Sequence, residues 1–455
     1  MKQQFKVGAA KIDITPPLGT LINGDFLPHY ARWIHDHLFA KALVLQSGET
    51  MIAFVVVDIM AIKKELVDLI KIEIENQTGI TKNNILISAT HTHAAGSVTD
   101  SLLTPVDFAY RKKILNLIPN AVVNAIQNLK PAKIGFGSVN APEHVICRRY
   151  FMKEGYTAIN PVTGKPDIIK TNPFNIEQFI GEPENELDPQ VCYLAVQGMD
   201  DKWISLLANY SVHYVGDWEN GTISADYFGF FANNLKQKLN ADDDFVGIMS
   251  NGTSGEANTW DFLHPNRYPK AFFAKSELIG NELAEKVVQS LNNLQWDSDP
   301  KLSSQYVEVE VAVRKPSADE LDAAKKLVAD TDFRNIQNVD AENLKRIYAR
   351  EQVLLNEFPD VISFPVQAIK IGNCIIGGLG GEIFAETGLS IKQSKGEVNY
   401  FTIGLANGNA GYVPPAQEFE LGGYETWRCR TSQLEVNAEN KIRNALKKIV
   451  EELTH

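Results

Sequence analysis

The chain has 455 residues, of which 44% are hydrophobic and 22% are charged, and its formal net charge at pH 7 is -12. This is the composition of an ordinary globular protein, and it excludes a disordered or low-complexity chain. The acidic balance argues against a nucleic-acid partner, since proteins that bind nucleic acids carry a basic surface. A local pocket for a small anion remains compatible with this charge, and nothing in the sequence predicts an oligomeric state.

The four cysteines are spread widely and include no Cys-x-x-Cys pair. They therefore predict neither a disulfide framework nor a cysteine zinc site. No run approaches the ~18 apolar residues that a membrane-spanning helix needs, so we expect no membrane span. The first residues lack the apolar segment of a signal peptide. We expect a cytoplasmic protein, or a periplasmic one if an export signal has been removed.

Strands and helices alternate along the first 140 residues. The predicted strands are 40–46, 51–58, 84–87 and 133–139, and the predicted helices are 61–77 and 106–129. This alternation favours an α/β fold with layered mixed β-sheets and flanking helices. The following segment, 141–190, is rich in Pro, Asn and Gly, and it predicts a long loop of the kind that often carries function.

The remainder of the chain continues the alternation. The predicted strands are 191–197, 203–210, 245–249, 361–371, 374–378 and 400–403, and the predicted helices are 225–239, 268–294, 318–356 and 435–453. The pattern at 318–356 is strongly charged, and we interpret it as a helical excursion over about 316–357. Because no internal repeat and no linker divides the chain, we predict a single domain over residues 1–455.

Potential metal ligands follow several of these strands. His91 and His93 come directly after the apolar run 84–87, at the carboxyl end of a strand, where α/β sheets usually bind ligands. His213 follows the strand at 203–210, and Glu382 follows the strand at 374–378. Two neutral imidazoles and a carboxylate are ordinary ligands of a catalytic zinc ion. A single histidine at a strand end is as often structural, so the pattern alone leaves both interpretations open.

From about Phe5 to Arg428 the sequence resembles the amino-terminal catalytic domain of the neutral/alkaline, non-lysosomal ceramidases. The resemblance rests on four segments in a fixed order: Val-Gly through Asp-Ile-Thr-Pro-Pro at 7–17, Ala-Thr-His-Thr-His at 89–93, Ser-Ala-Asp-Tyr at 224–227, and Tyr412 followed by Tyr424 and Glu425. It implies a ceramidase-type catalytic domain that binds Zn²⁺. The implied metal ligands are His91, His213, Glu382 and Tyr412. The implied catalytic, substrate-facing residues are His93, Arg148 and Tyr424.

The sequence departs from the family at three places. The family motif Gly-Asp-Val-Ser-Pro-Asn has its acyl-transfer serine at the fourth position, which is Asn258 here. Asn258 cannot act as that serine and enters the candidate catalytic set by position alone, while the role of the nearby Ser254 stays open. Arg149 replaces the serine after the family's motif arginine and makes a tandem with Arg148. The family's carboxyl-terminal immunoglobulin-like domain is not expected after the Tyr424 region.

These departures predict that the metal scaffold is kept while the substrate or the reaction has changed. Two adjacent arginines suit a carboxylate or sulfate better than a lipid amide, which makes Arg149 a candidate substrate-binding residue. Trp218 and Trp260 lie within five residues of His213 and Asn258. Their rings suit stacking on a sugar, although tryptophans near a site as often fill the core.

We therefore expect a zinc-dependent hydrolase or carbon–oxygen lyase that acts on a polar, anionic saccharide containing a uronic acid. The reaction would be metal-assisted hydrolysis or β-elimination, as in a dehydratase. One alternative is an amidohydrolase that cleaves ceramide or another N-acyl amide with metal-bound water. Another is a zinc-binding protein without catalytic activity.

Overall fold

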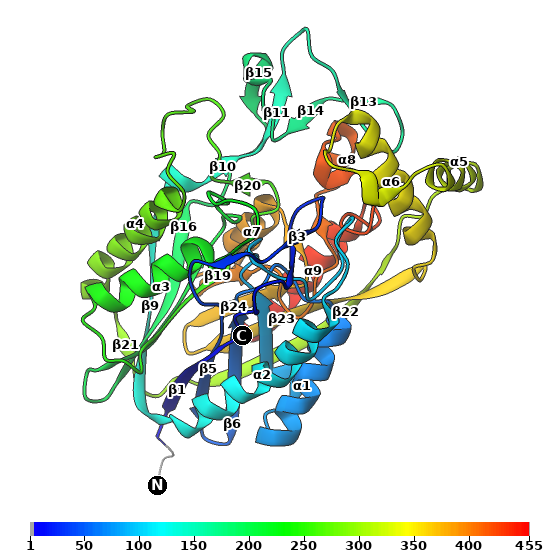
Figure 1. The fold of residues 1–455 in the computed structure, drawn as a ribbon. Coiled ribbons are helices and arrows are strands. Elements are labelled where there is room, and N and C mark those ends of the chain that lie inside the picture. The colour runs from blue at the N-terminus through cyan, green and yellow to red at the C-terminus, as the bar shows by residue number, and fades with distance from the viewer. Residues whose placement is uncertain (1–3, 455) are drawn as a thin grey trace.

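Two stacked β-sheets form the centre of the molecule, and helices cover both outer faces (Figure 1). The computed structural model describes residues 4–454. The larger sheet has the order β19-β17-β16-β9-β1-β5-β6-β7, with β21 paired to β9, and the smaller sheet has the order β22-β23-β24-β26. The strands of the larger sheet are β1 (Lys6–Asp13), β5 (Phe39–Ser47), β6 (Thr50–Val57), β7 (Ile85–Ala89), β9 (Lys130–Asn140), β16 (Gln190–Gly198), β17 (Trp203–Tyr210), β19 (Val246–Asn251) and β21 (Trp296–Asp297). Those of the smaller sheet are β22 (Leu302–Ala312), β23 (Val361–Ile371), β24 (Cys374–Leu379) and β26 (Asn399–Ile403).

Each outer face of the sheet pair has its own helices. On the larger sheet, α1 (Lys64–Thr78) and α2 (Phe108–Gln127) cover one half, and α3 (Asp226–Lys238) and α4 (Ala274–Ser290) cover the other. On the smaller sheet, α7 (Ala385–Ser394) and α9 (Ala438–Thr454) pack against the outer face. The order of layers is therefore helices, larger sheet, smaller sheet, helices. This confirms the predicted α/β fold of layered mixed sheets with flanking helices.

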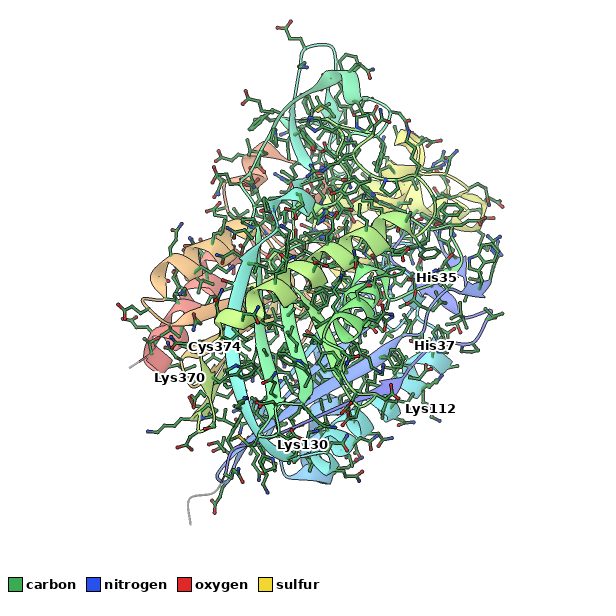
Figure 2. The ribbon with its side chains drawn as sticks, turned by 90° about the vertical axis from the view of Figure 1, so that its left-hand side faces the viewer. His35, His37, Lys112, Lys130, Lys370 and Cys374 are labelled. Atoms are coloured by element: carbon green, nitrogen blue, oxygen red, sulfur yellow. The ribbon has the colours of Figure 1, made fainter. Side chains whose placement is uncertain are left out.

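Strand β6 shows how the sequence specifies these layers. Successive side chains of a strand point to opposite faces of its sheet. Val55 and Val57 belong to the apolar layer beneath α1 and α2, whereas Phe54 and Val56 belong to the layer between the two sheets. A strand buried on both faces reads as a continuous apolar run, which is why this strand could be predicted. Figure 2 shows Lys370 and Cys374 of the smaller sheet on the opposite side of the molecule from His35 and His37.

Several further elements are short. They are β2 (Leu21–Asn23), β3 (His29–Tyr30), β4 (Trp33–Ile34), β8 (Ala95–Gly96), β18 (Thr222–Ile223), β20 (Ala257–Asn258), β25 (Glu382–Ile383), β27 (Tyr412–Val413) and the helix α8 (Glu418–Leu421). No helix among residues 4–454 combines the length and the apolar content needed to cross a lipid bilayer.

Two predictions of secondary structure were wrong, and one long strand was missed. The segment 141–190 is not a plain loop, because it contains six short strands, three of which form the sheet β14-β11-β15 at one end of the molecule (Figure 1). The pattern at 318–356 is two helices, because the carboxylate of Asp340 caps the second one at its first turn. Strand β22 was not predicted at all. The six strands are β10 (Ile146–Cys147), β11 (Arg149–Met152), β12 (Ala158–Ile159), β13 (Pro166–Asp167), β14 (Ile169–Thr171) and β15 (Ile180–Pro183), and the two helices are α5 (Ala318–Ala329) and α6 (Ala341–Asn356).

The charged excursion is only partly exposed. Ala324 is the one buried residue of α5, whereas α6 buries Ile347, Tyr348 and Leu355 against the rest of the protein. The prediction of a single domain over residues 1–455 stays a prediction, and residues 1–3 and 455 lie outside the described part of the chain.

Candidate metal centre

The carboxyl ends of three strands bring His91, His213 and Glu382 together. His91 follows β7, His213 follows β17, and Glu382 begins β25 just after β24. The backbone of His91 has a φ of 74°, a left-handed conformation that is uncommon for a residue with a side chain and that turns the chain sharply at the strand end. Glu382 lies directly opposite Tyr412 in the parallel pair of β25 and β27. The four predicted metal ligands thus lie at one edge of the stacked sheets.

Glu382 is the centre of this group. Its Oε2 atom lies 3.2 Å from Nε2 of His213 and 3.5 Å from Nε2 of His91. The possible ligand atoms of these three residues all lie within 4.8 Å of one another. The Tyr412 ring is stacked on that of His213, with centroids 6.5 Å apart and planes at 15°. All four side chains are buried, so water competes little for these donor atoms.

Backbone carbonyl groups set the orientation of both imidazoles. Nδ1 of His91 lies 2.8 Å from the carbonyl oxygen of Met60, and Nδ1 of His213 lies 2.6 Å from that of Ser254. A carbonyl can only accept, so each Nδ1 carries a proton, and in the neutral form of the ring the lone pair is on Nε2. Metal-binding histidines are commonly oriented by such a partner on the second nitrogen.

The charge states of His213 and Glu382 also indicate a metal site. Burial, reinforced by Arg148, lowers the pKa of His213 to about 4, so its imidazole is neutral at pH 7. Burial alone would raise the pKa of Glu382, but His91 and His213 hold it well below its usual range. An imidazole lone pair therefore faces an ionised carboxylate at 3.2 Å. Two acceptors at this distance repel each other unless a cation lies between them. The donor set thus fits a zinc-type metal ion with two nitrogen ligands, a carboxylate and a phenol.

His93 lies beside this group but does not belong to it. Its Nε2 atom is 3.1 Å from Nε2 of His91, and its ring stacks on Tyr214 with centroids 3.7 Å apart. Burial, together with His91 and His213, holds the pKa of His93 well below its usual value. Gly24 leaves room for the ring, because a Cβ atom at this position would lie 2.5 Å from Cβ of His93. His93 is therefore a neutral imidazole held in a tight, fixed position.

Arg148 lies behind Tyr412, where it contacts a predicted metal ligand. Its Nη2 donates to the Tyr412 hydroxyl at 3.0 Å and to the carbonyl oxygen of Gly255 at 2.6 Å, and its Nε donates to Glu425 at 2.8 Å. Burial raises the pKa of Tyr412 well above its usual value, and the positive charge of Arg148 opposes this rise. Arg148 therefore favours an oxygen ligand with anionic character at Tyr412.

The structure does not support a substrate-binding role for Arg149. This side chain is fully buried, and all three of its nitrogen atoms donate to acceptors of the chain. The acceptors are the carboxylates of Glu184, Glu418 and Glu425 and the carbonyl oxygen of Gly422. The sequence suggested an anion site because Arg149 is adjacent to Arg148. Carboxylates from distant segments instead neutralise the pair.

Asn258 and Ser254 are also engaged within the protein. The Asn258 amide donates to Asn172 at 3.0 Å, and its oxygen accepts from the backbone of Trp260 at 2.9 Å. The Ser254 hydroxyl donates to Asn251 at 2.8 Å. Two cavities border His93, and neither the Asn258 nor the Ser254 side chain lines either of them. Both side chains are thus hydrogen-bonded within the protein, and the catalytic role of Asn258 stays a prediction.

Two cavities adjoin the metal centre. The first, which we call the metal-side cavity, has a volume of about 100 Å³. The second, which we call the aromatic cavity, has a volume of about 240 Å³. The metal-side cavity is lined by His91, His93, Glu382, Tyr412 and Tyr424, and also by Lys63, Asp100 and Arg430. The aromatic cavity is lined by His93, Tyr214, Trp218 and Trp260, among others.

The predicted substrate-facing residues thus divide into two groups. Tyr424 lies in the metal-side cavity, and Trp218 and Trp260 lie in the aromatic cavity. Sequence reasoning missed Gly24, which makes room for His93, and Tyr214, which stacks on it. Tyr214 directly follows His213, and this adjacency is the only signal that could have pointed to it.

A second group of possible ligands, Glu143, His144 and Glu282, lies outside these cavities. Its members already have partners in the protein. His144 contacts Glu282 at 2.9 Å and the Tyr268 hydroxyl at 3.0 Å, and Glu143 pairs with Lys286 at 3.0 Å. This group is therefore explained without a metal ion.

Comparison with known proteins agrees with the resemblance seen in the sequence. The family model of the neutral/alkaline non-lysosomal ceramidase amino-terminal domain matches residues 5–260. The fold is similar to that of neutral ceramidase from Pseudomonas aeruginosa, with a TM-score of 0.74 and 17% identity over 99% of this chain and 74% of the other. A ceramidase complexed with C2 gives a TM-score of 0.74 and 16% identity over 99% of this chain and 75% of the other. At such identities the structural likeness shows the fold alone. Because the family model matches more than half of its residues, the chain belongs to the neutral/alkaline non-lysosomal ceramidase family.

Proposed function

We propose that this protein is a zinc-dependent enzyme that hydrolyses a polar, saccharide-type substrate without a serine nucleophile. The observation that carries the proposal is the convergence of the Nε2 atoms of His91 and His213 on the carboxylate of Glu382. These residues, together with Tyr412, would hold the metal. A zinc ion in such a site supplies a Lewis acid that activates water and polarises a substrate oxygen.

His93 is the residue best placed to move a proton. It is neutral and borders both cavities, so the ring nitrogen that carries no proton can accept one from water or from a substrate carbon. Tyr424 lines the metal-side cavity, and burial raises its pKa. Its hydroxyl therefore stays protonated and can donate a hydrogen bond to a substrate oxygen. Removal of a carbon-bound proton by His93 would instead give β-elimination from a uronic acid.

The metal-side cavity suggests a polar substrate. Lys63, Asp100 and Arg430 also line it, and both cations pair with Asp100. Because Arg430 also pairs with Glu351, two carboxylates balance the two cations. With the tandem arginines neutralised as well, the support for an anionic substrate weakens. Among the candidate substrates we therefore rank polar saccharides first, and saccharides that contain a uronic acid are one class of these.

A second candidate is hydrolysis of an N-acyl amide. Membership of the ceramidase family favours it. The engaged Asn258 and Ser254 side chains mean that amide cleavage would also proceed without a protein nucleophile.

The test is turnover by the zinc-loaded protein with neutral oligosaccharides, uronic-acid oligosaccharides and a fluorescent N-acyl amide. New reducing ends would support hydrolysis, and new ultraviolet absorbance from an unsaturated sugar would support elimination. Fluorescence release would favour the second candidate. Activity should be lost in His213→Ala and kept in Ser254→Ala. No turnover of any kind would contradict the proposal and leave a binding protein without catalytic activity.

A further inference from the structure

The aromatic cavity lies next to the metal-side cavity and is the larger of the two. The two share Gly24, Asp25 and His93 among their lining residues. The two cavities are therefore neighbouring compartments that meet at the turn of Gly24 and Asp25 and at His93. A substrate that fills both compartments must pass this imidazole.

Three aromatic rings form a wall of the second compartment. Tyr214 stacks on His93 with centroids 3.7 Å apart and planes at 17°. The ring of Trp260 meets Tyr214 edge to face, with centroids 6.0 Å apart, and the Trp218 ring lies 6.2 Å from it. The stack fixes Tyr214, while Trp218 and Trp260 are only partly buried and keep surface toward the cavity.

Polar groups accompany these rings. Within residues 4–454, the indole N–H groups of Trp33 and Trp427 donate to Thr222 and Asp167, whereas those of Trp218 and Trp260 have no acceptor in the protein. Asp25 and Asn220 also line this cavity, and the carboxylate of Asp25 already pairs with His29 at 3.0 Å. Aromatic faces beside indole donors without a partner suit a ring that has an apolar face and hydroxyl groups at its edge. A purely apolar acyl chain would leave these indole groups unpaired.

We propose that the aromatic cavity is a second sugar subsite, so that the substrate is at least a disaccharide whose reacting bond lies at His93. One ring would occupy the metal-side cavity, and its neighbour would stack on Trp218 and Trp260. This proposal rests on the proposed function, because it assumes that the substrate is a saccharide. It adds that two linked rings are needed and that the second ring supplies binding without contacting the metal ligands.

The test is equilibrium binding to the metal-free protein, measured by tryptophan fluorescence and calorimetry. The probes are cellobiose and digalacturonate, each compared with its own monosaccharide. We expect at least one disaccharide to bind about 10-fold or more tightly than its monosaccharide, as the loss of one aromatic stacking contact of ~1.4 kcal/mol implies. Trp260→Ala and Trp218→Ala should abolish this advantage, and Trp260→Phe should restore most of it. Trp296→Ala is the matched control, because Trp296 lies on β21 away from both cavities, and it should change nothing.

Three results would overturn the second subsite. They are equal binding of monosaccharide and disaccharide, an unchanged advantage in both tryptophan variants, and binding of hexanoate in place of any sugar. The proposed function fails separately. If the zinc-loaded protein cleaves a substrate with a single ring while disaccharide binding shows no advantage, the function stands and the subsite is wrong. If disaccharides bind as expected but no turnover occurs, the subsite stands and the function is wrong.

Discussion

Glu425 joins the two buried arginines behind the metal centre, and its replacement by glutamine tests how that centre is held. The side chain is fully buried. It accepts from Arg148 Nε at 2.8 Å, from Arg149 Nη1 at 2.9 Å and from Thr171 Oγ1 at 2.7 Å. Burial alone would raise the pKa of this carboxyl, but the two arginines hold it below its usual value, so it is ionised.

The expected loss of stability follows from the hydrogen-bond acceptors that each arginine keeps in the variant. Glu425→Gln preserves the shape but removes the charge, and the new amide N–H₂ must face one guanidinium. Arg149 retains the carboxylates of Glu184 and Glu418. Arg148 retains only the carbonyl oxygen of Gly255 and the Tyr412 hydroxyl, so its buried charge loses its carboxylate partner. Breaking a buried ion pair in this way costs about 3–5 kcal/mol.

Equilibrium urea unfolding at a fixed zinc concentration measures this loss. The matched control is Asp242→Asn, which removes an ion pair with Lys202 at 2.8 Å in which both side chains are largely exposed, and which should leave stability unchanged. A loss below about 1 kcal/mol in Glu425→Gln would refute the reasoning. It would mean that the guanidinium of Arg148 is solvated or paired in a way that the structure does not contain.

Three further predictions concern single side chains. Burial lowers the pKa of Lys71 from 10.5 to about 7. Between these two pH values the native state binds fewer protons than the unfolded chain, so the free energy of unfolding rises with pH, by at most about 5 kcal/mol. In Lys71→Met this pH dependence is removed. Thermal unfolding at several pH values should therefore show a flatter plot of Tm against pH for the variant, and a higher Tm at pH 7. Ser254→Ala should cost about 1 kcal/mol of stability and leave turnover within about twofold, since only Asn251 loses a hydrogen bond; a loss of activity greater than about 100-fold would reveal a serine nucleophile. Gly24→Ala should lower turnover at least about 10-fold while zinc stays bound. The reason is that the new Cβ atom collides with His93 and that the φ of 130° at this position disfavours a side chain. Unchanged kinetics would show that the position of the His93 ring is not critical.

Local patterns were sufficient to predict the layers and the strand ends. Strands β5, β6 and β7 are largely buried on both faces, so each is mostly apolar, although β5 contains the buried Lys41 and β7 the buried Ser88. Because His91 and His213 directly follow such strands, their position at one edge of the sheet could be predicted. The resemblance to ceramidases added the implied ligand role of Tyr412.

Long-range pairing explains what could not be predicted. Arg149 looks like an anion-binding residue in sequence, yet its partners Glu418 and Glu425 lie 269 and 276 residues further along the chain. Strand β22 has alternating charged residues on an exposed face and depends on pairing with β23 over its whole length. Propensity alone carries little information for such a strand, because its stability depends on cross-strand contacts.

The central claim is that His91, His213 and Glu382 form a metal centre, and the zinc content of the purified protein tests it most directly. After loading with zinc and extensive dialysis, we expect about one equivalent of zinc in the native protein and in His144→Ala, which disrupts the other group of possible ligands. His213→Ala should retain almost none while its circular dichroism spectrum stays native. Zinc retained in His213→Ala, or lost in His144→Ala, would contradict the account.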